Sequence, residues 1–410
     1  MGVGEERRAR RIHTVDDARR LARRRVPAMV FDYIDGGAES ERTMRANVEA
    51  LAAVEFVPRM AVTAGTPGPD LTTTVLGTPL ALPVILAPVG FTRSMDPAGD
   101  VAGARAAAAA GTVFTLSTMS GHPMEEVVAA YRDRAVSADR AGAEGRGGAW
   151  FQLYALGGRR GAEQLVERAQ EAGYSTLVVT VDTQIVGSRE RDLRHGASIP
   201  IRLDPRTMVR FAPKVVAHPR WLFDAARDRF HFEIVHASSL GGPDQPLSAD
   251  DALIQWVLSP VTWDDFEWIR RRWKGPVVAK GVLTGADARR ALDSGAEAVV
   301  VSNHGGRQLD GAPATMPALV EVVDAIGDRA EVLVDGGIRR GSDVVRALAL
   351  GARAVMVGRP WVYGLAAAGE PGVSRVLSVL RTGIDRTLRL MGSPSVQALD
   401  RSWVRVPDGR

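Results

Sequence analysis

The sequence predicts a (β/α)8 barrel with a helical segment before it and one long insertion after its fourth strand. Eight short apolar runs recur over about 280 residues from Pro83 onward, and amphipathic or alanine-rich segments separate them. Several of these segments end in glycine, the usual residue just beyond a helix. A doubly wound open sheet would not need eight strands, and no G-x-G-x-x-G follows the first run.

The predicted strands are rich in valine, isoleucine and leucine, as expected for strands buried on both faces. They are residues 84–88, 113–117, 150–154, 176–182, 276–280, 298–304, 331–337 and 354–359. The helices between them are predicted to stop at Gly111, Gly173, Gly295 and Gly351. With the amphipathic helix of residues 372–392, which closes the barrel, they define a barrel domain of residues 83–400.

Residues 1–82 are predicted to form a helical segment that packs on this barrel. Thr14 and Ser40 are candidate N-caps, and Gly36 ends the helix between them. Proline, glycine and threonine dominate from Val57 to Leu82, which predicts loops and a hairpin.

Residues 191–260 are too long for an ordinary connection between a strand and its helix. Such an insertion at the rim of a barrel suggests a lid, or a docking surface for a partner or a membrane. The aromatic side chains of Trp221, Phe223, Phe230 and Phe232 either are exposed there or pack on the rim. Residues 132–148 are predicted to be a surface loop.

The composition excludes several classes of protein. Hydrophobic residues make up 45% and charged residues 24% of the 410 positions, so a large core can be buried. Cysteine is absent, which excludes disulfides and thiolate metal sites and fits a reducing compartment. No metal site is expected. No apolar run approaches the ~18 residues of a membrane span, so we expect a cytoplasmic protein.

The positive charge is concentrated at the N-terminus. Residues 1–25 contain nine arginines and four acids, while the whole chain has a net charge of only +4. Either this segment is a solvated helix, or it attaches the protein to an anionic surface such as the inner face of the cell membrane. No nucleic-acid-binding module accompanies the arginines, so nucleic acid is not an expected partner.

Polar residues follow nearly every predicted strand. In a barrel the carboxyl ends of all strands meet at one mouth, where active sites lie. A single residue of this kind could be a structural cap or ion pair, but so many on otherwise apolar strands indicate an active site. They are Ser117, Gln152, Tyr154, Thr180, Asp182, Lys280, Ser302, His304, Asp335 and Arg359.

The last two strands predict a phosphate site. "DGGIRRG" and "VGRP" supply glycine backbone amides together with Arg339 and Arg359 in the loops after strands seven and eight. Backbone donors and a helix N-terminus bind phosphate at this position of many barrels. The phosphate could belong to a substrate or to a cofactor.

A set of motifs then resembles one family. "FDYIDGGAE", "WFQLY", "VTVDT", "SNHGGRQLDG", "VDGGIRRGSDV" and "ALALGARAVMVGRP" are similar to those of the FMN-dependent 2-hydroxy-acid dehydrogenases and oxidases. This family includes glycolate oxidase, lactate oxidase, mandelate dehydrogenase and respiratory L-lactate dehydrogenases. The match extends from about Thr14 to Asp400, and "GFTR" and "HPRWLFD" favour the bacterial L-lactate dehydrogenase branch.

The resemblance implies catalytic roles for four residues. His304 corresponds to the base that removes the substrate proton, and Asp182 to the carboxylate that stabilises the imidazolium. Tyr154 corresponds to a phenol at the substrate hydroxyl, and Lys280 to the cation beside the flavin N1 and O2 atoms, where charge accumulates on reduction.

The resemblance also implies a substrate site. Arg189 and Arg307 correspond to clamps for the substrate carboxylate, which Tyr33 also contacts, while Tyr154 and His304 lie at the reacting carbon. Met119 stands where several family members have a bulky aromatic residue at the substrate side chain. Methionine adapts to different shapes, so the exact acid stays open.

FMN is the cofactor that the resemblance implies. The residues corresponding to its site are Pro88, Val89, Gly90, Ser117, Gln152, Thr180, Lys280, Ser302, Asp335, Gly337, Arg339, Gly358 and Arg359.

The expected activity is oxidation of an L-2-hydroxy acid, L-lactate first, with electrons passed to a quinone or another carrier. One alternative is an oxidase that uses O2, makes H2O2 and accepts a larger, mandelate-like or specialised substrate. The other, from a different class, is a flavin-free aldolase or isomerase with a phosphorylated substrate. The resemblance further implies a homo-oligomer, a tetramer.

Overall fold

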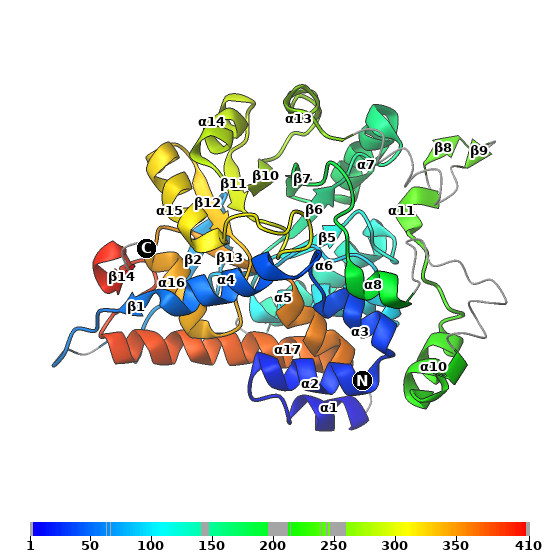
Figure 1. Ribbon diagram of the computed structural model, residues 1–410, viewed down its shortest axis with the longest axis horizontal. Coiled ribbons are helices and arrows are strands. Elements are labelled where there is room, and N and C mark those ends of the chain that lie inside the picture. The colour runs from blue at the N-terminus through cyan, green and yellow to red at the C-terminus, as the bar shows by residue number, and fades with distance from the viewer. Residues whose placement is uncertain are drawn as a thin grey trace.

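The structure is a computed structural model and shows a closed barrel of eight parallel strands surrounded by helices (Figure 1). It describes residues 3–62, 64–65, 67–140, 147–195, 212–213, 215–238, 240–242, 245–246 and 260–406. The barrel strands are β4 (Val84–Leu86), β5 (Phe114–Ser117), β6 (Ala149–Leu153), β7 (Thr176–Thr180), β10 (Val277–Val282), β11 (Ala298–Val301), β12 (Glu331–Val334) and β13 (Ala354–Val357). β13 pairs with β4, and β7 pairs with β10 across the insertion, so the predicted barrel is confirmed.

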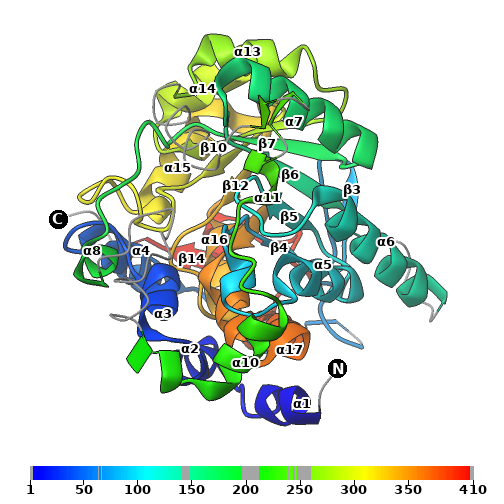
Figure 2. The ribbon, with the colours of Figure 1, turned by 90° about the vertical axis from the view of Figure 1, so that its right-hand side faces the viewer.

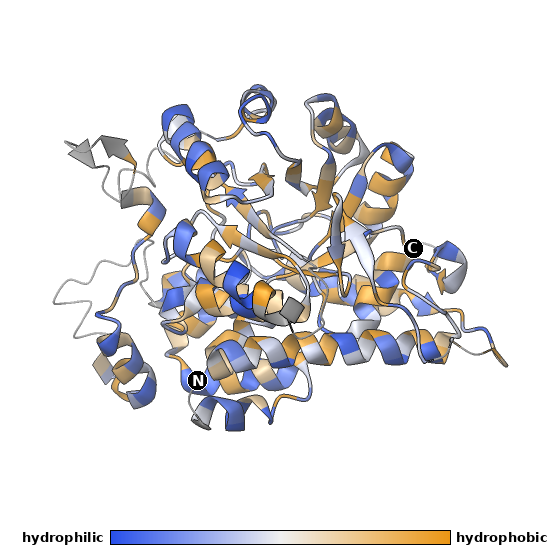
Figure 3. Ribbon diagram, turned by 180° about the vertical axis from the view of Figure 1, so that it is seen from behind, coloured by the Kyte–Doolittle hydropathy of each residue, from blue (hydrophilic) through white to orange (hydrophobic). Residues whose placement is uncertain are grey.

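The barrel helices follow their strands in the expected alternation. They are α5 (Gly99–Ala110), α6 (Met124–Arg140), α7 (Gly158–Ala172), α13 (Trp263–Arg270), α14 (Gly285–Asp293), α15 (Thr315–Ile326), α16 (Gly341–Ala349) and α17 (Arg359–Met391). Figure 3 shows mostly hydrophobic colour on the strands and both colours on the helices, which bury one face each. The four predicted glycine stops are confirmed, since Gly111, Gly173, Gly295 and Gly351 all have positive φ.

A β-hairpin closes the amino end of the barrel. It consists of β2 (Thr73–Val75) and β3 (Thr78–Leu80), and both turn residues, Leu76 and Gly77, have positive φ. Val75 and Leu80 are fully buried and join the apolar cluster inside the barrel, which includes Trp150. Because this end is closed, a ligand can reach the barrel interior only from the carboxyl ends of the strands.

The N-terminal segment forms α1 (Val3–Ala9), α2 (Val15–Arg25), α3 (Ala28–Asp35) and α4 (Arg42–Ala53). α1 and α2 lie along α17 (Figure 1), where Ile12, Val15 and Ala22 are buried. Thr14 caps α2 through a capping box with Asp17, as predicted.

The prediction that Ser40 caps the next helix is wrong. α4 begins two residues later, at Arg42, and the backbone amides of Arg42 and Thr43 donate to the carboxylate of Asp310 at 3.2 and 2.8 Å. A carboxylate from a loop 268 residues away in the chain therefore replaces the local cap. The prediction of a loop at 132–148 is also wrong as far as Arg140, where α6 ends.

The described part of the insertion contains α8 (Glu190–His195), α10 (Pro219–Arg227), α11 (Val235–Ser238), and the two-residue strands β8 (Gly241–Gly242) and β9 (Gln245–Pro246). Within the predicted 191–260 insertion, residues 196–211, 214, 239, 243–244 and 247–259 lie outside the described residues. Trp221 is buried and stacks on Phe232, whereas Phe223 is 66% exposed and Phe230 is 41% exposed.

The shorter elements are β1 (Glu55–Phe56), which pairs with β14 (Val404–Arg405), and three 3-10 turns at Thr92–Ser94, Gly327–Arg329 and Arg401–Trp403. Among the described residues, no helix combines the length and the apolar composition that crossing a bilayer requires.

Candidate active site

A cavity of about 410 Å³ opens at the carboxyl ends of the strands, opposite the hairpin. It is lined by all but three of the residues to which the sequence assigned catalytic, substrate-binding or cofactor-binding roles. Those that line it are Tyr33, Pro88, Val89, Gly90, Ser117, Met119, Tyr154, Thr180, Arg189, Lys280, His304, Arg307, Asp335, Gly337, Arg339, Gly358 and Arg359.

The three remaining residues support the lining from behind. Asp182 contacts His304, and Ser302 accepts a hydrogen bond from Lys280 at 2.9 Å. Gln152 accepts from the Ser117 hydroxyl at 3.2 Å and donates to the Thr180 hydroxyl at 3.1 Å. In this structure all three contact side chains that face the cavity, and the predicted contacts of Gln152 and Ser302 with FMN stay a prediction.

His304 lies where β11 gives way to its loop, with φ of 58°. This left-handed conformation is uncommon for a residue with a side chain, and the two glycines that follow it share it. Nδ1 lies 3.1 and 3.2 Å from the two carboxylate oxygens of Asp182, and Nε2 lies 3.4 Å from the Tyr154 hydroxyl. A proton on Nδ1 donates to Asp182, which leaves Nε2 to accept a proton inside the cavity.

The electrostatics suit that assignment. Burial alone would raise the pKa of Asp182, but the nearby His304 and Lys280 lower it below its usual value, so this carboxylate stays charged. Burial, assisted by the charge of Asp182, raises the pKa of Tyr154, which therefore remains a hydrogen-bond donor.

Two arginines form one cationic group on the cavity wall. Both Arg189 and Arg307 lie over the ring of Tyr33, at 5.7 and 4.9 Å from its centre. Burial and the charge of Arg189 lower the pKa of Arg307 to about 9. Among the described residues, Nε and Nη1 of Arg189 are buried without a hydrogen-bond partner. Two cations in one buried site, with unused donors, favour an anion such as a carboxylate.

A second cationic group lies at the loops after β12 and β13. Burial lowers the pKa of Arg359, and the charge of Arg339 acts in the same direction. The backbones of Gly337 and Gly358 border the same part of the cavity, and α17 begins there. The sequence predicted Arg359 as a phosphate ligand, but its guanidinium also donates to the carbonyls of Ile34, Gly36 and Gly305 at 3.1, 2.7 and 2.8 Å.

Lys280 and Asp335 form a buried pair in the lining of the same cavity. Lys280 Nζ lies 3.0 Å from Asp335 Oδ2. Burial alone would lower the pKa of Lys280, but the carboxylates of Asp335 and Asp182 raise it, so the ammonium keeps its charge. The other oxygen of Asp335, Oδ1, is buried without a hydrogen-bond partner among the described residues. It can accept a bond from a hydroxyl-bearing ligand.

The donor set fits FMN. The arginine and glycine group suits its phosphate, the open acceptor on Asp335 suits a ribityl hydroxyl, and the Lys280 ammonium suits a ring that gains negative charge. Arg189 and Arg307 then remain for another anion, although Arg307 adjoins Arg359, since both donate to the Gly36 carbonyl.

Several residues of the lining were not predicted from the sequence. Val186 lies between β7 and the insertion, Leu193 and Asp192 lie at the start of the insertion, and Phe91 follows the first barrel strand. The residues from the insertion follow no periodic pattern, so no sequence signal marked them. Asp192, within "RERD", was visible as an acid beside a predicted clamp, and its carboxylate lies 3.9 Å from Arg189.

Comparison with known proteins agrees with this geometry. The model of the FMN-dependent dehydrogenases matches residues 22–406. The chain belongs to this family. The match excludes the flavin-free aldolase or isomerase considered above, and the protein is an FMN-dependent 2-hydroxy-acid oxidoreductase.

Relatives within the family carry different names. The chain is 42% identical to pre-mycofactocin synthase from Mycobacterium tuberculosis over 97% of this chain and 95% of the relative. It is equally identical to L-lactate dehydrogenase from Caulobacter vibrioides, over 97% of this chain and 99% of the relative. A crystal structure of (S)-mandelate dehydrogenase, described as a monotopic membrane protein, superposes with a TM-score of 0.84, 36% identity and coverage of 96% and 99%. Family membership alone therefore does not define the substrate.

Proposed function

We propose that the protein oxidises an L-2-hydroxy acid, L-lactate in the first place, to the 2-oxo acid, and that the electrons pass to a quinone or another carrier. The observation that carries this proposal is the position of His304. Its Nε2 lies 3.4 Å from the Tyr154 hydroxyl, in a cavity that Arg189 and Arg307 also line, and these two arginines suit a carboxylate. Arg339 and the glycine backbones that line the same cavity suit a phosphate.

The side chains divide the work of the reaction. Arg189 and Arg307 bind the substrate carboxylate, and Tyr33 lies against both guanidinium groups. Nε2 of His304 accepts the proton of the substrate hydroxyl, which the Tyr154 hydroxyl helps to orient. Asp182 holds Nδ1 and stabilises the positive ring that results.

FMN would be held by Lys280, Asp335, Arg339 and the glycine backbones at the loops after β12 and β13. When bound, it supplies the acceptor for the hydride equivalent that leaves the substrate carbon. Lys280 presents a buried positive charge, which favours extra electrons on a neighbouring ring.

Met119 borders the cavity at the position that corresponds to the substrate side chain. A Cβ built on Gly90 would lie 2.6 Å from Met119 Cβ, so the methionine packs tightly against the turn after β4 and is 7% exposed. The L-lactate dehydrogenase among the relatives agrees with a small substrate. A second candidate is an oxidase that uses O2 on a larger, mandelate-like acid, because methionine can adopt other rotamers and widen the pocket.

Anaerobic stopped-flow measurement tests both candidates. The flavin-loaded protein is mixed with L-lactate, D-lactate, glycolate or (S)-mandelate, and reoxidation is then followed with a quinone analogue or O2. We expect L-lactate to bleach the flavin fastest and the quinone to restore it faster than O2. Faster reduction by mandelate together with fast reoxidation by O2 would favour the second candidate, and no reduction by any acid would refute both.

We also propose that the protein binds the surface of an anionic membrane and assembles as a tetramer. Exposed Phe223 lies on α10, next to the arginine-rich helices α1 and α2 (Figure 2). An ion pair of 3.0 Å between Arg25 and Asp224 joins α2 to α10. An apolar side chain within a basic surface suits the interface of an anionic bilayer.

The proposed assembly as a tetramer is tested by light scattering coupled to size-exclusion chromatography.

A further inference from the structure

The two parts of the carboxylate site come from distant segments of the chain. Tyr33 lies on α3, in the N-terminal segment, whereas Arg189 lies just before α8, after the fourth barrel strand. The Arg189 guanidinium lies 5.7 Å from the centre of the Tyr33 ring. Whatever fixes α8 against α3 therefore fixes the geometry of the carboxylate site.

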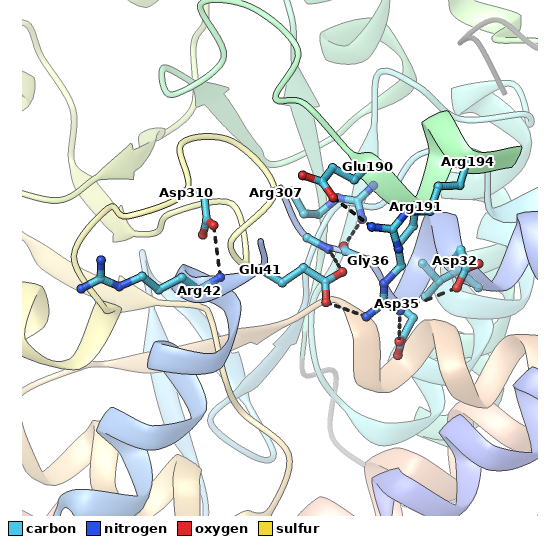
Figure 4. Close-up of polar contacts among 12 residues, drawn as sticks. Asp32, Asp35, Gly36, Glu41, Arg42, Glu190, Arg191, Arg194, Arg307 and Asp310 are labelled. Atoms are coloured by element: carbon cyan, nitrogen blue, oxygen red, sulfur yellow. Dashed lines mark hydrogen bonds and ion pairs between the residues drawn. The ribbon is translucent and has the colours of Figure 1, made fainter. Parts of the chain in front are cut away.

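Arg191, on α8, joins these segments (Figure 4). Its Nη1 lies 2.8 Å from Asp35 Oδ2, and its Nη2 lies 2.6 Å from Glu41 Oε2. Asp35 is the last residue of α3, and Glu41 immediately precedes α4. One guanidinium thus bridges acids at both ends of the loop from Gly36 to Glu41.

Both acids are held by other groups. The carboxylate of Asp35, only 2% exposed, also accepts from Arg19 at 2.5 and 2.8 Å and from the Tyr363 hydroxyl at 2.7 Å. Burial alone would raise the pKa of Asp35, but these donors and Arg191 lower it. Glu41 Oε1 accepts the backbone amide of Gly37 at 3.0 Å. Ion pairs that are buried and hydrogen-bonded in this way affect the stability of the fold more than exposed pairs do. Removing one partner leaves a buried charge without compensation and destabilises the fold.

The loop from Gly36 to Glu41 also contacts the rest of the site. The Gly36 carbonyl accepts from Arg307 at 3.0 Å, and the Glu39 amide donates to the Ser188 carbonyl at 2.7 Å. A Cβ on Gly36 would lie 2.7 Å from a backbone oxygen and 3.4 Å from Arg191 Cδ, so the close approach depends on glycine.

We propose that Arg191 is a positioning residue which, through Asp35 and Glu41, holds Arg189 against Tyr33 and thereby sets the affinity for the substrate carboxylate. This inference rests on the proposed function. The carboxylate keeps its charge throughout the reaction, so its contacts are equal in the ground state and the transition state. Loosening them raises KM and leaves kcat nearly unchanged.

The test compares Arg191→Met with Arg194→Met in the flavin-loaded protein. Arg194 is the matched control because it lies on the same helix, is 74% exposed, and pairs at 3.0 Å with Glu190 of that helix (Figure 4). We expect Arg191→Met to raise KM for L-lactate by about 10-fold, with kcat changed by less than about 3-fold and flavin content unchanged. Arg194→Met should change neither constant.

A second readout requires no turnover. Oxalate is a dicarboxylate without a C–H bond, so the enzyme cannot oxidise it by removing a hydride. It is titrated into the protein while the flavin absorbance is recorded. Its dissociation constant should rise in Arg191→Met by about the same factor as KM, and Arg191→Lys should recover part of the loss because it retains the charge. Arg191→Met combined with Glu41→Gln should cost less than the sum of the single changes.

Unchanged KM and oxalate affinity in Arg191→Met would overturn the proposal, as would an equal loss in Arg194→Met. If Arg191→Met does not fold, the Arg191→Lys variant tests the proposal in its place. A KM and an oxalate affinity equal to those of the wild type in Arg191→Lys would then count against the proposal. If no hydroxy acid reduces the wild-type flavin, the proposed substrate is refuted, whereas the oxalate comparison still decides the role of Arg191.

Discussion

His304 acquires its chemistry from two neighbours and from its backbone. The left-handed φ of 58° turns its ring between the Asp182 carboxylate and the Tyr154 hydroxyl. The next residues, Gly305 and Gly306, continue this conformation, and a Cβ on Gly306 would lie 2.6 Å from the backbone of Met44. The motif therefore needs glycine after the histidine both for φ and for space.

Replacing His304 with Gln should separate binding from chemistry. The side-chain amide of glutamine can still donate a hydrogen bond to Asp182, so we expect FMN and a carboxylate inhibitor to bind normally. Without an imidazole to accept the hydroxyl proton, flavin reduction by L-lactate should slow by ~10²-fold or more. Stopped-flow absorbance measures this rate, and a near-normal rate would show that another group is the base.

Arg339 offers a cleaner test of the phosphate site than Arg359. Arg359 donates to the carbonyls of three residues, so its loss would also loosen the loop at Gly36. The Arg339 guanidinium instead donates to the carbonyl of the adjacent Ile338 at 2.8 Å. Arg339→Gln should lower the flavin content after dialysis several-fold, because a charge-assisted bond to phosphate is lost. Arg340→Gln, which alters an exposed neighbour, is the control. If Arg339→Gln and Arg340→Gln retain the same flavin content after dialysis, the FMN phosphate binds elsewhere.

At the scale of elements, α11 attaches the insertion to the barrel. His236 on this helix is fully buried, and its Nδ1 lies 3.0 Å from the Thr118 carbonyl. Its ring meets Phe151 edge-on at 5.9 Å. Burial lowers the pKa of His236 to about 4, from 6.5. The ring is therefore neutral in the folded protein at neutral pH.

Acid should weaken this attachment. Between pH 6.5 and about 4, His236 binds a proton in the unfolded chain but not in the folded chain. The free energy of unfolding therefore decreases as the pH falls through this window, and the stability present above pH 6.5 is lost. His236→Leu removes the group, and the difference in Tm between wild type and variant should shrink or reverse from pH 7 to pH 4.5. Thermal melts at both values measure it. A difference that is independent of pH would mean that His236 is not protonated on unfolding.

At the scale of the whole molecule, the N-terminal helices belong to the folded body. Ile12 is fully buried and its carbonyl accepts from Arg375 at 2.8 Å, and Arg8 donates to the Ala367 carbonyl at 3.0 Å. Some arginines of the first 25 residues are thus structural, while Arg7, Arg10 and Arg11 are exposed.

The exposed arginines provide a test of membrane attachment that spares the fold. Replacing Arg7, Arg10 and Arg11 with Gln should lower binding to vesicles with anionic lipid, more visibly at low salt, where charges are less screened. Phe223→Ser, on α10, should lower binding at all salt concentrations because it removes apolar contact. Vesicle co-sedimentation measures both. Equal binding of wild type to neutral and anionic vesicles would refute the electrostatic part.

The sequence alone determined the barrel and the type of its site. Eight runs of β-branched and apolar residues can be buried on both faces only within a parallel sheet, and closure brings their polar ends, such as Lys280 and His304, to one mouth. The period of the apolar runs and the direction of the strands already dictate which end of the barrel each residue occupies.

Only the tertiary structure decided how separate loops meet at that mouth. Asp310 caps α4 from a distant loop, Arg191 joins α8 to α3, and Val186 and Leu193 reach the cavity from the segment that follows β7. Such contacts depend on the path of irregular backbone, which carries no period, and on side chains that could equally well face water. The sequence does not show whether a charged side chain beside a glycine-rich loop is exposed to solvent or buried between two carboxylates. Only the packing of the folded chain distinguishes these two environments.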